Sequence, residues 1–225
     1  IFYAYDDTAG REPWVTDGTP AGTFRLADIN SGTGSSNTDD TGDNAGFVQV
    51  GAQMFFSADD GTTGRELWVT DGTVAGTRLV TEIVAGSGGG YFAQAAAFQN
   101  LLYFAAPGIG LWSSDGTAGG TAPLVEGIFS GGLRELTAVG DLLYFTSSGR
   151  LWVSDGTVPG TIEVASLDST SRGPEALTAV NSNVLAFWAE TSAVGREIFL
   201  AYPSSLGPDT EGPIVLPITP PNAPL

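Results

Sequence analysis

The sequence predicts an all-β chain folded as a β-propeller, most simply with five blades of four antiparallel strands each. Three observations predict it: one ten-residue phrase recurs four times, short runs rich in Val, Ile, Leu and aromatic residues recur around it, and no segment shows a sustained helical period. The copies lie 40 to 54 residues apart, which suits four short strands per unit. Five such units fit the 225 residues.

The first run of a unit is expected to be a short strand that ends in a tight turn. It reads FVQV at 47, AAAF at 95, and LTAV at 136 and again at 177. The residues that follow include Gly51, Gln99-Asn100, Gly140 and Asn181, and Gly and Asn suit hairpin turns with positive φ. The chain opens at Ile1 on the second run, so we expect the first unit to lack a first strand.

The second run reads IFYAYDD at 1, MFFSADD at 54, LYFAAP at 102, LYFTSS at 143 and LAFWAE at 185. These runs align at the aromatic residues Tyr3, Phe56, Phe104, Phe145 and Phe187. Apolar residues often occupy both faces of these runs, as in MFF and LLYF. A sheet with one wet face would alternate instead, so the pattern predicts sheets stacked between two neighbours.

The third run leads into the phrase itself, Trp-x-Ser/Thr-Asp-Gly-Thr-x-x-Gly-Thr. Its key residues are Trp14, Asp17, Gly18, Thr19, Trp68, Asp71, Gly72, Thr73, Trp112, Asp115, Gly116, Thr117, Trp152, Asp155, Gly156 and Thr157. We interpret it as a structural turn. Asp accepts hydrogen bonds from backbone N–H groups, the first Gly takes positive φ, and the Thr hydroxyl pairs with backbone polar groups that would otherwise lack a partner. Trp is expected to pack between blades with its N–H bonded, and the second Gly to allow another bend. The alternative is that each Asp helps to bind a cation or a sugar.

The fourth run, such as RLVTEI at 78, completes each unit. The expected propeller spans residues 1–218, with units at about 1–46, 47–91, 92–133, 134–175 and 176–218, and a Pro-rich tail at 219–225. The fifth unit keeps Arg196, Glu197 and Phe199 but lacks the Asp-Gly-Thr triplet. Residues 212–218 either complete that unit or cross to the first unit and close the ring.

The phrase resembles the repeat of the bacterial ELWxxDGT-repeat proteins. The best copy is RELWVTDGTVAGT at 65–77, with weaker copies starting at 11, 110 and 150. The resemblance covers nearly the whole chain through its repeats, and it implies secreted or surface-attached propeller proteins. It implies no activity. The chain departs from the pattern at Pro13, where Leu is expected, and at the lost fifth triplet.

Composition excludes several functions. The formal net charge is −17, and the eight basic residues are all Arg, with no Lys, His or Cys. Such a chain repels nucleic acid and anionic lipid, and no run is apolar enough to insert into a membrane. A Ser-His-Asp triad, thiolate chemistry and His or Cys zinc sites are impossible. Carboxylate chemistry remains, but the acids Glu12, Glu66 and Glu197 recur at repeat positions, where we expect them to pair with the Arg of the same turn or of an adjacent blade.

One acidic loop is a candidate metal site. Residues 35–46 read SSNTDDTGDNAG, and Asp39, Asp40 and Asp43 offer the oxygen ligands that Ca²⁺ prefers. The spacing matches no complete EF-hand loop, and a solvated acidic loop is the simpler interpretation. No cofactor is required, and Ca²⁺ is the metal we would expect.

The sequence thus predicts a non-enzymatic protein outside the cell or on its surface. We expect a structural or adhesive interaction module that binds protein subunits or surface components, as part of an assembly. A glycan-binding lectin is the alternative, and a carboxylate-dependent glycosidase the third hypothesis. No leader sequence opens the chain, so secretion would need a signal that is not in these residues.

Overall fold

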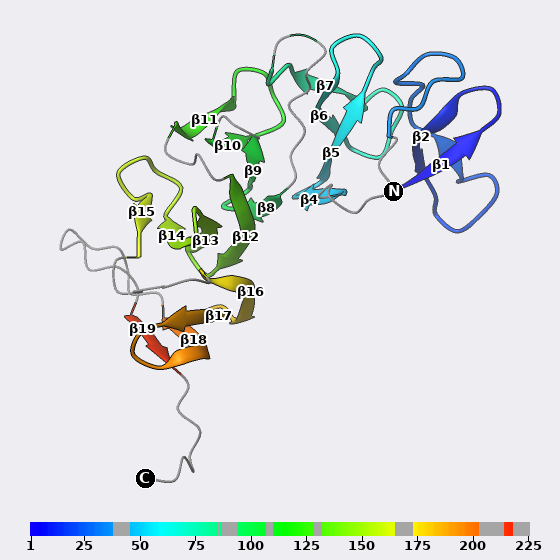
Figure 1. The fold of residues 1–225 in the computed structure, drawn as a ribbon. Helices are drawn as coiled ribbons and strands as arrows, with labels where there is room; N and C mark the ends of the chain where they lie inside the picture. Colours follow the sequence, from blue (N-terminus) through cyan, green and yellow to red (C-terminus); the bar gives the residue numbers. More distant parts are fainter. Residues whose placement is uncertain are drawn as a thin grey trace. The chain divides into compact units, whose positions relative to one another are not determined.

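The computed structural model describes residues 1–37, 46–84, 86, 94–106, 110–127, 132–164, 173–202 and 214–217. These residues contain 19 strands and no helix, in five sheets whose pairings are antiparallel (Figure 1). One sheet has three strands and four sheets have four. The all-β prediction is confirmed. No helix long and apolar enough to cross a membrane occurs among the described residues.

The chain divides into two compact units, residues 1–107 with 111–123, and residues 124–225 with 108–110. The first three sheets belong wholly or mostly to the first unit. They are β1 (Phe2–Asp6), β2 (Gly10–Val15) and β3 (Phe24–Arg25); β4 (Val48–Val50), β5 (Gln53–Asp59), β6 (Arg65–Thr70) and β7 (Arg78–Thr81); and β8 (Ala95–Phe98), β9 (Leu101–Ala106), β10 (Gly110–Ser114) and β11 (Thr121–Glu126).

The other two sheets belong to the second unit. They are β12 (Leu133–Val139), β13 (Leu142–Ser147), β14 (Arg150–Ser154) and β15 (Ile162–Glu163); and β16 (Glu175–Asn181), β17 (Val184–Thr191), β18 (Gly195–Tyr202) and β19 (Ile214–Pro217). Each sheet runs in chain order, so within a sheet each strand after the first pairs with the one before it in sequence. The strands fall within the repeat ranges expected from the sequence, except that β12 and β16 each begin one residue early.

The first and fifth sheets differ in their number of strands. Among the described residues the first sheet contains β1, β2 and β3. In the fifth sheet, β19 pairs with β18, from Phe199 opposite Pro217 to Tyr202 opposite Ile214. The segment therefore completes the fifth sheet, the first of the two uses foreseen for it. The Pro-rich tail at 219–225 lies outside the described residues.

The turns after the first strands explain their Gly and Asn residues. Gly51, Gln99, Asn100 and Gly140 all have positive φ, between 49° and 61°. The prediction of left-handed turns is confirmed there. In the last sheet the turn is built differently, because the Asn181 side-chain oxygen accepts the Asn183 N–H at 2.8 Å.

The alignment of the second runs needs one correction. In the sheets, Phe56 lies opposite Trp68, Phe145 opposite Trp152 and Phe187 opposite Phe199. In the first sheet the residue opposite Trp14 is Phe2, not Tyr3. The two Asp-Asp pairs misled the alignment, because they are one residue out of register: Asp6 occupies the position of Asp60, and Tyr5 that of Asp59.

In both units, neighbouring sheets pack through the same pair of faces. In the second unit, Leu142, Tyr144 and Val153 on one face of β13 and β14 pack against Leu185 and Phe187 of the next sheet. In the first unit, Tyr3 is a neighbour of Phe56, and its hydroxyl donates to the Ser57 carbonyl at 3.0 Å. The first sheet thus presents its Tyr3-bearing face to the Phe56-bearing face of the second, and the fourth sheet presents its Tyr144-bearing face to the Phe187-bearing face of the fifth.

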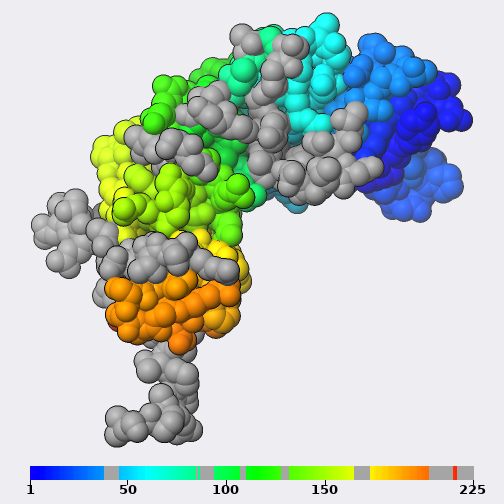
Figure 2. Space-filling model, viewed as in Figure 1, coloured from blue at the N-terminus to red at the C-terminus, as the bar shows by residue number. Residues whose placement is uncertain are grey.

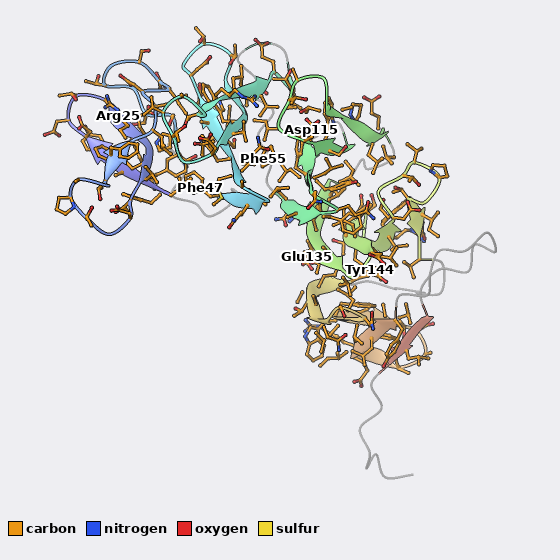
Figure 3. The ribbon with its side chains drawn as sticks, turned by 180° about the vertical axis from the view of Figure 1, so that it is seen from behind. Arg25, Phe47, Phe55, Asp115, Glu135 and Tyr144 are labelled. Atoms are coloured by element: carbon orange, nitrogen blue, oxygen red, sulfur yellow. The ribbon has the colours of Figure 1, made fainter. Side chains whose placement is uncertain are left out.

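The first strands of neighbouring sheets lie side by side, β4 beside β8 and β12 beside β16. Glu135 in β12 has a φ of 57°, and its carboxylate accepts the Leu177 N–H of β16 at 2.8 Å (Figure 3). Ala176 and Gly46 hold the equivalent positions, with φ of 57° and 68°. The recurring left-handed residue bends the strand, and at Glu135 it also links two sheets.

Candidate functional site

The repeated turn is built from short-range hydrogen bonds, and the second copy shows the pattern. Asp71 Oδ1 accepts the Thr73 backbone N–H at 3.0 Å and the Thr73 hydroxyl at 2.6 Å. The Gly72 N–H donates to the Thr70 hydroxyl oxygen at 3.0 Å. The Gly76 N–H donates to Thr73 Oγ1 at 3.0 Å, and the Thr77 hydroxyl donates to the Thr73 carbonyl at 2.7 Å. The turn thereby satisfies its own polar groups.

All four copies have this network. The first Gly of each copy donates its N–H to the preceding Ser or Thr hydroxyl, and the distance is 3.0 Å in every copy. The carboxylate contact to the Thr N–H recurs at 2.8 to 3.0 Å. Figure 3 labels Asp115 in the third copy. The acceptors are Asp17, Asp71, Asp115 and Asp155, and the hydroxyls belong to Thr16, Thr70, Ser114 and Ser154.

The two Gly positions of each copy require Gly for different structural reasons. The first Gly has φ between 88° and 90° in all four copies, a conformation that L side chains rarely adopt. The second Gly, at 22, 76, 120 and 160, has no positive φ but lies against the Asp carboxyl, where a Cβ would overlap the carboxyl atoms. We expected a second bend there, and a turn is present, since the Thr77 N–H donates to the Val74 carbonyl at 3.3 Å; the close approach to the carboxyl is a further reason for Gly.

The electrostatics of the turn do not suit acid catalysis. Hydrogen bonds from the following Thr hydroxyl and N–H lower the pKa of Asp17, Asp71 and Asp115 below the usual Asp value. These carboxyls are therefore ionised near neutral pH. Among the described residues, no group of three or more acidic, His or Cys side chains could hold a metal ion. The turn has neither a proton to give nor a ligand set for a metal.

The Trp side chains of the repeated phrase pack against neighbouring side chains, but among the described residues three of their N–H groups lack the hydrogen bond that we expected. Trp68 packs against the cluster that contains Phe56 and Ala58, and Trp112 lies 6.3 Å from Phe104 between ring centroids. The Nε1 atoms of Trp14, Trp68 and Trp112 are buried and have no hydrogen-bond partner among the described residues. Ring packing, not a hydrogen bond, thus orients these side chains.

The sequence missed the role of one recurring acid. Glu12 is fully buried, and its carboxylate accepts the N–H groups of Ile29, Asn30 and Ser36 at 3.1 to 3.2 Å. Burial raises its pKa despite these hydrogen bonds. Glu66 repeats part of the arrangement by accepting the Ile83 N–H at 2.6 Å. These glutamates fasten β2 and β6 to the segments that follow β3 and β7, the last strands of their sheets.

The expected pairing of Glu12 with the Arg of its own turn is therefore corrected. The Arg11 guanidinium lies over the Tyr3 ring, 5.9 Å from its centroid, while Glu12 points to backbone amides. Consecutive residues of a strand face opposite sides of the sheet, so Arg11 and Glu12 cannot meet. That alternation was the signal available in the sequence. In the fourth sheet Arg150 takes the position of Glu66 and pairs with Glu163 at 2.5 Å.

Other predicted residues do not form a site that can be described. The candidate Ca²⁺ ligands Asp39, Asp40 and Asp43 all lie outside the described residues. Asp60 is consumed in its own turn, where its carboxylate accepts the Thr62 and Thr63 N–H groups at 2.8 Å. Asp6 does the same with the Thr8 N–H at 2.7 Å.

The first and fifth sheets each have an exposed aromatic side chain. On the fifth sheet, Trp188 is 39% exposed, the Arg196 guanidinium lies over its ring, and Arg196 pairs with Glu175. Strands β17 and β18 form most of the orange surface in Figure 2. On the first sheet, Phe2 is 36% exposed on the face opposite to Tyr3. The residues equivalent to Phe2 in the second and fourth sheets, Phe56 and Phe145, are buried.

Comparisons with known proteins give limited similarity. No family model matches the chain, and no curated protein matches it. Among solved structures, a puromycin hydrolase variant is 22% identical over 68% of this chain and 25% of its own, with a TM-score of 0.49. The tricorn protease is 16% identical over 83% of this chain and 17% of its own, with a TM-score of 0.27. The chain spans a quarter or less of either protein.

The prediction of a structural or adhesive interaction module is wrong by this comparison. The similar solved structures are a hydrolase and a protease, and neither is an adhesion protein. The error has a physical origin: the repeated polar residues satisfy one another within the turn, so their recurrence reports on folding and says nothing of a ligand.

Proposed function

We propose that the chain is a five-bladed β-propeller domain that has no catalytic chemistry of its own. It supplies a rigid body, and any reaction in which it takes part is carried out by groups of another segment or chain. One observation carries this proposal: the recurring polar side chains are consumed in local hydrogen bonds, as Asp71 and Glu12 are. The chain also lacks His, Lys and Cys, which are the usual bases and nucleophiles.

The packing rule supports five blades closed into a ring. The Tyr3-bearing face of one sheet packs on the Phe56-bearing face of the next, and the second unit repeats this with Tyr144 and Phe187. Under the same rule, two faces are left over: the Phe2-bearing face of the first sheet and the Trp188-bearing face of the fifth. Each contact between sheets described above joins one face of each type, and closing the ring places these two faces against each other.

Cysteine cross-linking tests the closure, because the natural chain has no Cys. Ala4 lies on the Phe2-bearing face and Ala186 on the Trp188-bearing face, and both are partly buried. We expect an Ala4→Cys/Ala186→Cys variant, treated with a short bis-maleimide, to give an internally linked monomer. The control Ala4→Cys/Val158→Cys places the second thiol on an exposed turn and should stay unlinked. Linked dimers, or equal linking in both variants, would contradict the ring.

Activity measurements test the absence of catalysis. Purified chain should hydrolyse neither peptide nor glycoside substrates above the rate of a heat-unfolded sample. Hydrolysis that co-purifies with the chain and is lost on Asp60→Asn or Glu175→Gln would overturn the proposal, because it would show a working carboxylate. Retention of the same trace rate by both variants would identify a contaminant and leave the proposal standing.

Other features stay predictions. The resemblance to ELWxxDGT-repeat proteins is supported by the four copies of the phrase. Location outside the cell is supported by the acidic, Lys-free composition, and weak Ca²⁺ binding by the Asp39, Asp40 and Asp43 loop. Calorimetry with Ca²⁺ on the natural chain and on the triple Ala variant of that loop decides the last point.

A further inference from the structure

We infer that the repeated turn also protects its Asp–Gly peptide bond from rearrangement to isoaspartate, and that the hydroxyl before each Asp is a protecting group. Four such bonds lie in the turns, at 17–18, 71–72, 115–116 and 155–156. Asp–Gly is the dipeptide most open to this reaction, since Gly leaves its own nitrogen unhindered. The inference concerns the chemical lifetime of the chain and is independent of the proposed function.

The rearrangement has defined requirements. The Gly backbone nitrogen attacks Cγ of the preceding Asp, loses its proton, and forms a new C–N bond. The protonated carboxyl loses one oxygen as water, which gives a five-membered succinimide. A water molecule then adds to either carbonyl, and opening at the backbone carbonyl leaves isoaspartate. The net change is an isomerisation, with one water lost and one gained and no oxidant or reductant.

The turn opposes the attack at the nitrogen. The Gly72 N–H donates to the Thr70 hydroxyl oxygen at 3.0 Å, and the same contact has the same length in the other three turns. That proton must leave for the nitrogen to act as a nucleophile. The hydrogen bond also fixes the plane of the peptide group, so rotation toward Cγ breaks it.

The turn also opposes the attack at the carboxyl. Asp71 Oδ1 is held by the N–H and hydroxyl of Thr73, so the carboxyl is pulled toward Thr73 and not toward its own neighbour. Gly76 lies against the carboxyl atoms and limits their movement. The same hydrogen bonds lower the pKa of Asp71, which leaves less of the protonated form that can release water.

A fifth Asp–Gly bond, between Asp60 and Gly61, obeys the same principle with different atoms. The Gly61 N–H donates to the Asp59 carboxylate at 2.7 Å, and the Asp60 carboxylate accepts two N–H groups further along the turn. Every Asp–Gly bond of the chain thus has its nitrogen and its carboxyl engaged elsewhere.

The test is a Thr70→Val variant, which removes the hydroxyl and keeps the shape of the side chain. Natural chain and variant are aged at neutral pH and body temperature, and isoaspartate is measured at each bond by peptide mapping. We expect it to rise at Asp71 alone, by about fivefold to tenfold, the factor that one hydrogen bond is worth. Asp17, Asp115 and Asp155 in the same molecule are internal controls.

A second variant, Ser114→Ala, should raise isoaspartate at Asp115 and leave Asp71 unchanged. In urea all five bonds should rearrange at similar rates in natural and variant chains, since the turns are then absent. Unchanged isoaspartate at the altered turn would overturn the inference. An equal rise at all four turns would also overturn it, because that would show general loosening of the fold and no local protection.

Discussion

At the scale of single residues, the turn depends on how closely its second Gly approaches the Asp carboxyl. The third copy offers a comparison between adjacent positions. Gly120 lies against the Asp115 carboxyl, whereas a Cβ at Gly119 would meet nothing within 4 Å. The two residues lie in the same turn. Substitutions at these positions therefore distinguish steric crowding of the Asp115 carboxyl from loss of backbone flexibility.

We therefore predict opposite outcomes for two substitutions. Gly120→Ala should destabilise the fold by about 1–3 kcal/mol, because the carboxyl has to move and its hydrogen bonds to Thr117 weaken. Gly119→Ala should be neutral or slightly stabilising, because Ala restricts the unfolded chain more than Gly does. Urea unfolding measures both. Equal losses would show that the carboxyl contact is unimportant.

The turn carboxylates also predict an acid dependence. Their pKa is lowered in the folded chain, so their contribution to stability is present above about pH 4 and is lost as the pH falls through the folded value. Melting temperatures of natural chain and Thr73→Val should differ at neutral pH and converge in acid. A difference that persists unchanged in acid would contradict the role of the Thr73 hydroxyl. Glu12, whose raised pKa acts with the opposite sign, is common to both proteins and cancels.

At the scale of elements, two buried glutamates, Glu12 and Glu66, fasten β2 and β6 to the segments that follow the last strands of their sheets. Glu12 accepts three backbone N–H groups, and one of these, that of Ser36, also donates to the Arg11 carbonyl at 3.1 Å. Removing the carboxylate takes the acceptor away from the Ile29 and Asn30 N–H groups, which costs more than the loss of an exposed ion pair.

Glu12→Ala should accordingly reduce the free energy of unfolding by about 3 kcal/mol or more. Glu175→Ala breaks the ion pair with Arg196, whose side chains are 43% and 48% exposed, and should cost about 1 kcal/mol or less. Chemical denaturation of both variants tests the contrast. Similar losses would mean that Glu12 does not anchor residues 29–36.

The sequence predicted the strands, their order and the turns, because those depend on residues close together in the chain. It did not predict features that depend on strand register or on hydrogen-bond partners distant in the chain. The two Asp-Asp pairs favoured Tyr3 over Phe2, and only the pairing opposite Trp14 shows the offset. The partners of Glu12 come from 17 to 24 residues away in an irregular segment, which no local pattern indicates.

At the scale of the whole molecule, the proposed ring makes the first and last sheets depend on each other. Phe2 and Trp188 are 186 positions apart in the chain and each is about a third exposed. If their faces meet, the two substitutions should not act independently.

We predict a coupling of about 0.5–1.5 kcal/mol between Phe2→Ala and Trp188→Ala in a double-mutant cycle, measured on a monomeric sample. The control cycle pairs Trp188→Ala with Phe24→Ala, an exposed aromatic on β3, and should be additive. Additivity in both cycles would argue against closure, whereas coupling in both would point to a general change in the fold.

The short reach of the turn's hydrogen bonds has a consequence for how such a chain arises. Within each turn, no hydrogen bond joins residues more than seven positions apart. A DNA segment that is duplicated therefore carries this network with it. A contact from outside a turn adds to the network, as where the Arg78 guanidinium donates to the Gly116 carbonyl at 2.7 Å. Chains of this type can thus gain or lose blades by recombination, with only the packing between sheets left to adjust.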